Sequence, residues 1–424
     1  MGVFLIISFI VLMFFGVPIA VSMGLSSMLS IIVFGKYSTL AITHQIISGI
    51  DSYILIAIPF FILAGELMNT GGITTRIFNF ANWLVGRIPG GMGHTNVVAS
   101  IIFSGMSGSA VADTGGLGLI EMKAMKEHGF DDGFSAAVTC ASATIGPIIP
   151  PSIPLIVFGA MAEVSIGKLF LGGIIPGLLL GLALMILVYI ISKKRSYPIR
   201  ERFTRKETWV TIKRGILPLF APIIIIGGIL LGVFTPTESA IIACVYACLL
   251  SVLYKEINFQ KLKAVLLNTL ITSSTIMFII AAAKSFSWLL AMEGVPQSLT
   301  SFILSITNSP GLIILVLNVV LLIMGMFMEG LSVLTIIVPF LTPLMQAIGL
   351  DPVHMGVMVV LNLMIGLSTP PVGMSLFVMN RIAGVKLQDL YKEILPFLIP
   401  LIAVLIIIAY YPGFVLWLPS LFLK

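Results

Sequence analysis

Long apolar runs, separated by short polar stretches, fill most of this chain. Each run is at least as long as the roughly 20 residues that a helix needs to cross a hydrocarbon core about 30 Å thick. The uncharged runs cover residues 1–35, 88–112, 133–162, 170–192, 215–237, 264–283, 294–328, 330–350, 352–380 and 394–423. They are too long for membrane β-strands and do not alternate, so the pattern predicts an all-α polytopic membrane protein.

The composition excludes the common soluble classes. Of the 424 residues, 58% are hydrophobic and only 9% are charged, whereas soluble domains carry roughly 25% charged residues. Nine of the 23 Lys and Arg residues lie in one polar stretch, residues 193–214. Such a cluster beside two spans indicates the cytoplasmic side of the membrane rather than a nucleic-acid site.

Three sequence motifs recur in the same order on both sides of that polar stretch. The pairs are GVPIAVS from Gly16 with GVFTPTES from Gly232, SGMSGSAV from Ser104 with MGMFMEGL from Met324, and GPIIPPS from Gly146 with GLSTPPV from Gly366. The last two pairs share one displacement of 220 residues. We therefore predict two inverted repeats, residues 1–192 and 215–424, joined by a cytoplasmic linker at 193–214.

Each repeat contains a Pro-Pro pair inside an apolar run. A proline removes the N–H that would bond the carbonyl four residues earlier, so Pro150–Pro151 would free the carbonyls of Gly146–Pro147. In the same way Pro370–Pro371 would free those of Gly366–Leu367. We expect broken helices at about 133–163 and 353–383 whose bare oxygens suit a hard cation such as sodium. A proline kink satisfied by neighbouring helices is the alternative.

Clusters of glycine and serine precede both proline pairs by about 40 residues. The first, Ser104–Ser109, is a poor continuous helix, and its flanking arms are too short to span the membrane separately. We expect re-entrant helical hairpins at about 96–128 and 312–348, with their tips near Gly108 and at Gly325–Ser332. Close packing of helices through small residues is the alternative reading.

These motifs together resemble the large membrane subunit, the DctM-like component, of tripartite ATP-independent periplasmic (TRAP) transporters. The resemblance is carried by PFFILAGELMN, SGMSGSAVAD, IGPIIPPSIPLIVFG, GVFTPTESA and STPPVGMSLFV, and it extends over essentially the whole chain. It implies an elevator-type inverted-repeat fold in the bacterial inner membrane. It also implies sodium-coupled uptake of C4-dicarboxylates, sialic acid or other sugar acids, with a small four-helix membrane subunit and a periplasmic binding protein as partners.

The resemblance also implies two sodium sites. The first would use Ser104, Ser107, Gly146, Ile149 and Pro151, and the second Gly325, Gly366, Thr369, Val372 and Met374. The second set matches the family less well, because Met328 and Glu329 replace the hydroxyls expected by symmetry. Sodium is the only metal expected, and no other cofactor is.

Candidate substrate residues lie at the two tips and breaks, where helix N-termini favour carboxylates. They are Ser109, Asp113, Ser152, Ser368, Ser375 and Arg381, the last of which can equally be an anchor at the membrane surface. Four more charged residues interrupt apolar sequence without an assigned role: Glu66, Glu238, Lys284 and Glu329. Each marks a site, a structural ion pair or a side chain that extends to the membrane interface, because charge is costly within the membrane.

No enzymatic motif is present. The four histidines form no HExxH, and the chain has no nucleophile elbow and no Walker phosphate loop. We expect a transporter that contacts lipid and a small membrane partner through its outer segments, 1–35, 170–192 and 215–254. The inner segments, 96–163 and 311–380, would move around the ions. A stand-alone sodium/dicarboxylate symporter, and an intramembrane enzyme or scaffold, are the alternatives.

Overall fold

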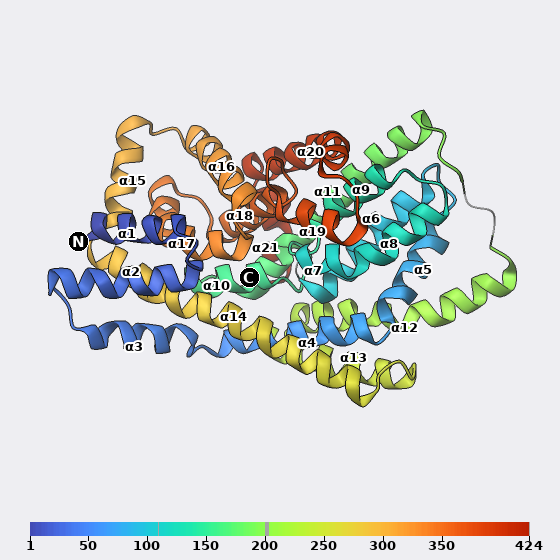
Figure 1. Ribbon diagram of the computed structural model, residues 1–424, viewed down its shortest axis with the longest axis horizontal. Coiled ribbons are helices and arrows are strands. Elements are labelled where there is room, and N and C mark those ends of the chain that lie inside the picture. The colour runs from blue at the N-terminus through green and yellow to red at the C-terminus, as the bar shows by residue number, and fades with distance from the viewer. Residues whose placement is uncertain (109, 200–202, 424) are drawn as a thin grey trace.

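The computed structural model describes residues 1–108, 110–199 and 203–423, without the side chains of 105–107 and 111–112. Within those ranges all regular elements are helices (Figure 1). Eight of the described helices are long and apolar enough to cross a membrane. The prediction of an all-α polytopic membrane protein is therefore confirmed.

The first half of the chain contains twelve helical elements in the described ranges. They are α1 (Gly2–Phe14), α2 (Ile19–Phe34), α3 (Thr39–Ile50), η1 (Tyr53–Ile56), α4 (Ala57–Thr70), α5 (Ile73–Val85), α6 (Gly91–Ser107), α7 (Ala110–Gly115), α8 (Leu117–Glu127), α9 (Asp132–Ala143), α10 (Ile153–Ala162) and α11 (Ile166–Lys194).

The second half repeats much of this order. It contains α12 (Arg205–Leu230), α13 (Pro236–Leu253), α14 (Phe259–Met292), α15 (Val295–Ile306), α16 (Pro310–Phe327), α17 (Gly330–Ile348), α18 (Pro352–Gly366), α19 (Met374–Ala383), α20 (Leu387–Tyr410) and α21 (Gly413–Phe422). The helices before the breaks, α9 and α18, begin at residues 132 and 352, and those after them, α10 and α19, at 153 and 374. These offsets are close to those between the paired sequence motifs.

The segment 193–214 differs from the predicted linker at both ends. Helix α11 continues to Lys194, and α12 already begins at Arg205. A capping box starts α12, in which the Thr204 hydroxyl accepts the amide of Glu207 and the Glu207 carboxylate accepts the amide of Thr204. Polar residues therefore form the first turns of a spanning helix instead of a loop.

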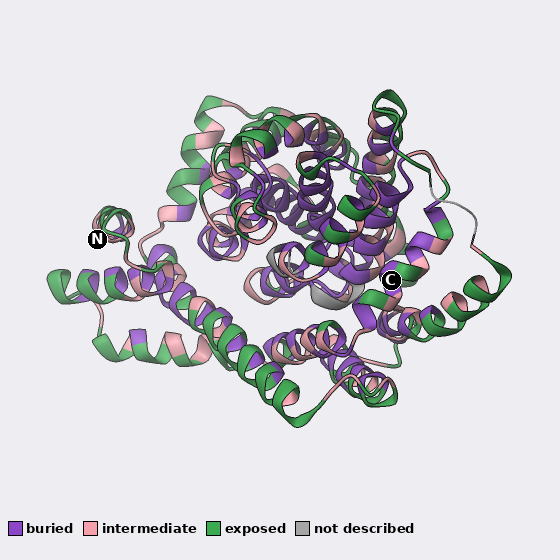
Figure 2. Ribbon diagram, turned by 45° about the vertical axis from the view of Figure 1, so that its right-hand side comes forward, coloured by how far each residue is buried: buried purple, intermediate pink, exposed green. Residues whose placement is uncertain are grey.

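The core lies among the helices that surround the breaks. Every residue of α18 from Val353 to Gly366 is buried, and Figure 2 shows buried ribbon in the centre with exposed residues along the outer helices. Helix α11, which the sequence grouped with the outer segments, packs against α20, α21, α6 and α18. Helix α11 also keeps apolar residues such as Leu182 and Ile186 exposed, in agreement with the apolar flank expected there, and its assignment to the outer group stays a prediction.

The long helix α14 forms the frame on the opposite side. It packs against α2, α3 and α4 and crosses the molecule as the long yellow helix of Figure 1. It also contacts α17. Helix α14 therefore lies beside both the early helices and the inner helix α17, while α4 and α5 also contact the inner helix α6 directly.

Candidate functional site

Both proline pairs lie in gaps between helices. Helix α9 ends at Ala143 and α10 begins at Ile153, while α18 ends at Gly366 and α19 begins at Met374. The peptide bonds Pro150–Pro151 and Pro370–Pro371 are both cis. All residues of the first gap, 144–152, are buried. Both runs thus contain broken helices; the first break lies inside the protein, whereas in the second Pro370 and Val372 are partly exposed and Pro371 is exposed.

The first break contacts the glycine turn that precedes it in the chain. Gly108 adopts φ +59°, and a Cβ there would lie 2.9 Å from the carbonyl oxygen of Pro151. A Cβ at Gly146 would overlap the carboxylate of Asp113, which is buried. Glycine is therefore required at both positions by close approach. The structure brings the end of α6 and the start of α7 against this break.

The second break makes the corresponding contact with the end of α16. A Cβ at Gly366 would lie 2.8 Å from the backbone of Gly325, and the amide of Gly373 donates to the carbonyl of Met326 at 3.0 Å. Glu329 lies in the turn that follows and caps α17 by accepting the amide of Ser332 at 3.0 Å. The structure therefore gives Glu329 a local role at the start of a helix.

Most of the carbonyls that the prolines were expected to free have protein partners. The Ser152 hydroxyl donates to Pro147, and the carbonyls of Gly366–Leu367 accept the amides of Thr369 and Ser375, at 3.0 Å each. The expectation of bare oxygens was wrong for these three groups, because a local turn brings Thr369 to one of them and the chain folds back after the prolines to bring Ser152 and Ser375 to the others. Each carbonyl oxygen keeps a second lone pair.

The hydroxyl groups of both breaks are oriented by backbone carbonyls. Ser104 donates to the carbonyl three residues earlier at 2.6 Å, Thr369 to the one four residues earlier at 2.7 Å, and Ser368 to Cys140 at 2.9 Å. A hydroxyl that donates its hydrogen in this way leaves its oxygen lone pairs for a cation. The buried Ser375 hydroxyl has no hydrogen-bond partner within the described part of the chain.

The remaining sequence candidates are placed differently. Ser109 and the side chain of Ser107 fall outside the described residues. Ile149 packs against Gly177 of α11, while Val372 and Met374 are partly exposed. Arg381 is exposed in the last turn of α19, about 10 Å along the helix axis from its start. The structure therefore does not bring Arg381 to the break.

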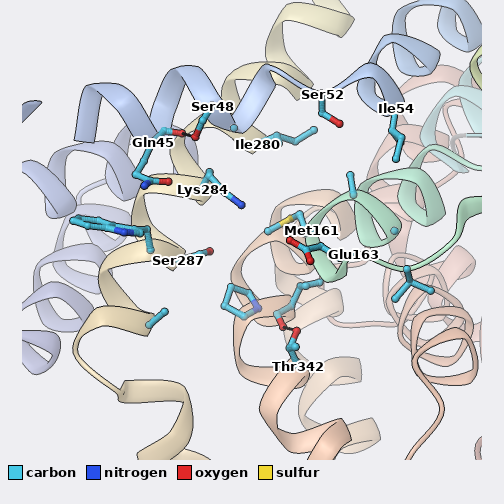
Figure 3. A pocket seen from close by; sticks show the side chains of 18 of the residues that line it. Gln45, Ser48, Ser52, Ile54, Met161, Glu163, Ile280, Lys284, Ser287 and Thr342 are labelled. Atoms are coloured by element: carbon cyan, nitrogen blue, oxygen red, sulfur yellow. Dashed lines mark hydrogen bonds between the residues drawn. The ribbon is translucent and has the colours of Figure 1, made fainter. Parts of the chain in front are cut away.

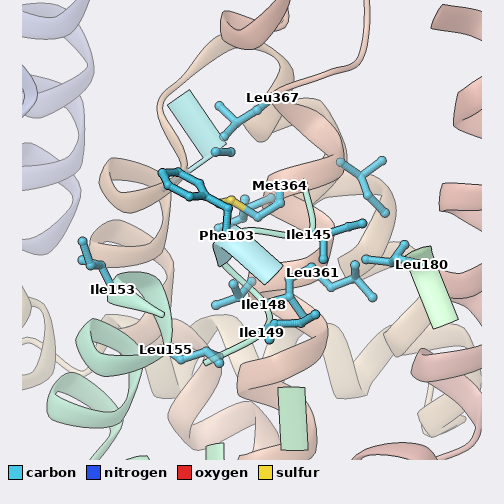
Figure 4. Packing of buried hydrophobic residues seen from close by; sticks show 14 of the residues in the cluster. Phe103, Ile145, Ile148, Ile149, Ile153, Leu155, Leu180, Leu361, Met364 and Leu367 are labelled. Atoms are coloured by element: carbon cyan, nitrogen blue, oxygen red, sulfur yellow. The ribbon is translucent and has the colours of Figure 1, made fainter. Parts of the chain in front are cut away.

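Apolar side chains from both halves surround the first break. Ile148 and Ile149 are buried together with Leu180, Leu361 and Met364 (Figure 4). This packing excludes water and strengthens the electrostatic interactions of any polar oxygen that stays inside. The low local polarity fits a site whose ligand must replace a hydration shell.

Sequence reasoning missed two polar pairs at similar places in the two halves, one buried and one partly buried. Asn96 of α6 accepts the Ser142 hydroxyl of α9 at 2.6 Å, and the Asn362 amide of α18 donates to Asn318 of α16 at 2.7 Å. Each pair joins a helix that ends at a glycine turn, α6 or α16, to the helix that ends at the neighbouring break, α9 or α18. The signal was present, because both pairs lie in apolar runs at the spacing of the repeated motifs.

A small cavity lies where the two glycine turns and the two helix breaks meet helices α4 and α14. Its volume is about 150 Å³. It is lined by Gly108 and Glu329 from the two turns, by Pro147 and Leu367 from the breaks and by Glu66 of α4. Elements from both halves of the chain therefore surround one space.

Comparison with known proteins identifies the family. A sequence model of the DctM component of tripartite ATP-independent periplasmic transporters matches residues 6–414. The chain belongs to this family. It is a subunit of a TRAP transporter, a multi-pass protein of the bacterial inner membrane, and not an enzyme.

Named relatives transport different acids. The sialic acid TRAP transporter large permease protein SiaM of Vibrio cholerae is 44% identical over 97% of both chains. The C4-dicarboxylate large permease protein DctM of Pseudomonas aeruginosa is 40% identical over 94% of both. The sialic acid permease protein SiaT of Haemophilus influenzae is 40% identical over 97% of this chain, but the match covers 67% of that protein.

Solved structures support the fold of this TRAP subunit. The YdaH transporter of Alcanivorax borkumensis superposes with a TM-score of 0.62 at 12% identity, covering 88% of this chain and 87% of that one. MtrF of Neisseria gonorrhoeae superposes with a TM-score of 0.59 at 10% identity, covering 88% of this chain and 85% of that one. Identities this low carry information about the fold alone.

Proposed function

We propose that this TRAP subunit couples inward sodium flow to the uptake of a small organic acid. The observation that carries the proposal is the pair of broken helices, each packed against a glycine turn from its own half of the chain. We infer the substrate class from the names of the relatives, which are transporters of sialic acid and of C4-dicarboxylates.

The chemistry of the breaks supports sodium as the coupling ion. Sodium is a hard cation that prefers neutral oxygens, and the site candidates supply backbone carbonyls together with the hydroxyls of Ser104 and Thr369. Both hydroxyls already donate their hydrogens to the backbone, so their oxygens can only accept. Each positive charge that moves down 100 mV releases roughly 2.3 kcal/mol, enough to drive accumulation of an acid.

We further propose that the two inverted halves form an elevator. The inner helices α6–α10 and α16–α19, with two re-entrant hairpins, would move as one unit against α14 and the early helices. The packing supports this division, because α10 contacts α17 and α19 contacts α7, which joins the halves around the breaks. Crosslinking the inner group to α14 through engineered cysteines should stop uptake.

Two partners complete the proposed transporter. A periplasmic binding protein would deliver the acid, and a small four-helix membrane subunit would cover the outer apolar face. That face is formed in part by α12 and α13, where Ile223, Val245, Leu249 and Leu253 are exposed. An exposed apolar surface of this kind lies against lipid or another membrane protein.

The sodium proposal is tested by Thr369→Val in proteoliposomes that contain all three components. The variant removes one accepting oxygen but keeps the side-chain shape, so half-maximal uptake should require several-fold more sodium. Thr269→Val is the matched control, because Thr269 is equally buried (8% exposed) and makes the same bond to the carbonyl four residues earlier. Equal sodium dependence in both variants would remove Thr369 from the site.

A further inference from the structure

A second and much wider cavity lies away from the breaks. Its volume is about 930 Å³, and it separates α3, α14 and α15 on one side from α10 and α17 on the other (Figure 3). Its lining shares no residue with that of the small cavity between the glycine turns. Ligand sites commonly have volumes of about 300–1,000 Å³, so a molecule the size of a sugar fits with room to spare.

One cation faces this cavity. Lys284 of α14 is exposed although its neighbours Ala283 and Ser285 are buried, and Figure 3 shows its ammonium group directed into the open space. Within the described part of the chain no ion pair of Lys284 is found. A lysine on an otherwise apolar helix face, pointing into a cavity, is typical of a ligand site.

The stem of Lys284 is held in place by helix packing. A Cβ at Gly49 of α3 would lie 2.8 Å from the Cβ of Lys284 and 3.2 Å from the Cα of Ala281. Helix α3 therefore packs closely on α14 at this residue and leaves little freedom for the first carbons of the side chain. The charge is positioned before any ligand arrives.

One anion lies across the cavity. Glu163 ends α10 in the left-handed region at φ 56° and is exposed. The other polar side chains of the described lining are neutral: Gln45, Ser48, Ser52, Ser165, Ser287, Trp288, Gln297 and Thr342. A single positive charge, a single negative charge and several hydroxyl and amide groups therefore face one space.

The cavity opens on the side of the membrane opposite the basic segment. Helix α11 begins at Ile166, shortly after Glu163, and its 29 residues end at Lys194, within the Lys/Arg cluster. That length corresponds to about 43 Å, enough to cross the bilayer. With the basic cluster in the cytoplasm, the cavity lies on the periplasmic side, where a delivered acid arrives.

We propose that this cavity is a receiving site for an organic acid with one carboxylate and several hydroxyl groups. Lys284 pairs with the carboxylate, while Glu163 accepts hydrogen bonds from hydroxyls at the other end. A C4-dicarboxylate is disfavoured, because its second carboxylate would face Glu163 and be repelled by it. The whole molecule would also fill little of the cavity. The inference rests on the proposed transport of an organic acid, and it assigns to that transport a site distinct from the breaks.

The test uses a cysteine at Ser48, which is partly exposed and lines the cavity next to Gly49, the residue that packs on Lys284. Ser48→Cys is made in a Cys248→Ser background, since Cys248 is the exposed cysteine of the described chain. The transporter in liposomes is treated with an anionic thiosulfonate reagent. Occupancy of the site slows the modification by a factor of one plus the ratio of the ligand concentration to its Kd, so sialic acid at about four times its Kd should slow it about fivefold. Succinate should leave the rate unchanged.

Substitutions then assign the protection to the charges. Lys284→Gln should abolish protection by sialic acid and Lys284→Arg should retain it. Lys263→Gln, at the far exposed end of the same helix, should behave as the parent. Glu163→Gln should allow succinate to protect. Protection that is absent in the parent, or unchanged by Lys284→Gln, would overturn the site.

Sodium-driven uptake is measured on the same preparations. Sodium-driven uptake without protection of the cysteine would exclude the receiving site but would not contradict the proposed function. Protection without any sodium dependence would remove the proposed coupling while the acid site remained. The two proposals therefore fail by different observations.

Discussion

The closest backbone approach at the second break gives a direct test of its role. At Gly366 an alanine methyl would lie 2.8 Å from both the Cα and the carbonyl carbon of Gly325, and neither atom can rotate away. Overpacking of this kind typically costs about 1–3 kcal/mol. Because 1.4 kcal/mol corresponds to a tenfold change in an equilibrium constant, we expect Gly366→Ala to weaken sodium activation by roughly five- to 100-fold.

The assay is the sodium concentration for half-maximal uptake in proteoliposomes, together with the thermal stability of the purified variant. Gly366 is the last residue of α18, so alanine also gains up to about 1 kcal/mol of helix propensity, which offsets part of the packing cost. The melting temperature should therefore change less than the sodium affinity does.

Two further alanine variants control the experiment. Gly311→Ala lies in α16, the helix that contains Gly325, and its methyl group would meet only Tyr410 at an ordinary 3.5 Å. It should behave as wild type. Gly325→Ala, with its nearest atom at 3.2 Å, should give an intermediate effect. A normal sodium requirement in both Gly366→Ala and Gly325→Ala would refute the idea that this glycine contact shapes an ion site.

Three other predictions follow from described contacts. Single and double alanine variants of Asn318 and Asn362 should show a coupling energy of about 0.5–3 kcal/mol in thermal unfolding, because the partly buried Asn318 amide accepts from the buried Asn362 amide; additive losses would contradict this. The hydrogen bond from Lys36 lowers the pKa of Glu293, just beyond α14, from its ordinary 4.5, so this contact stabilises the fold above that pH and is lost on acidification. Lys36→Gln should therefore shrink the drop in melting temperature between neutral pH and about pH 4, and an unchanged drop would count against it. Gly108→Ala should reduce uptake more than it reduces expression, since its φ of +59° disfavours a side chain.

The positions of the breaks were predictable because proline acts locally. Two adjacent prolines remove two N–H donors and fix two rings, which ends a helix, whereas single prolines such as Pro176 of α11 and Pro339 of α17 lie inside continuous helices. The structure accordingly ends α9 and α18 a few residues before each pair. The partners of the freed carbonyls were not predictable, because Ser152 and Ser375 reach them only after the chain turns back.

The apolar runs, the paired motifs and the prolines by themselves determined that this is a helical membrane protein with two interrupted helices, since length and missing donors are properties of the chain. Only the tertiary structure decided which groups meet. It packed α11 against α6 and α18, paired Asn318 with Asn362, and set Lys284 opposite Glu163 across an open space. Such contacts join residues far apart in sequence, and their geometry depends on how whole helices pack rather than on any local preference.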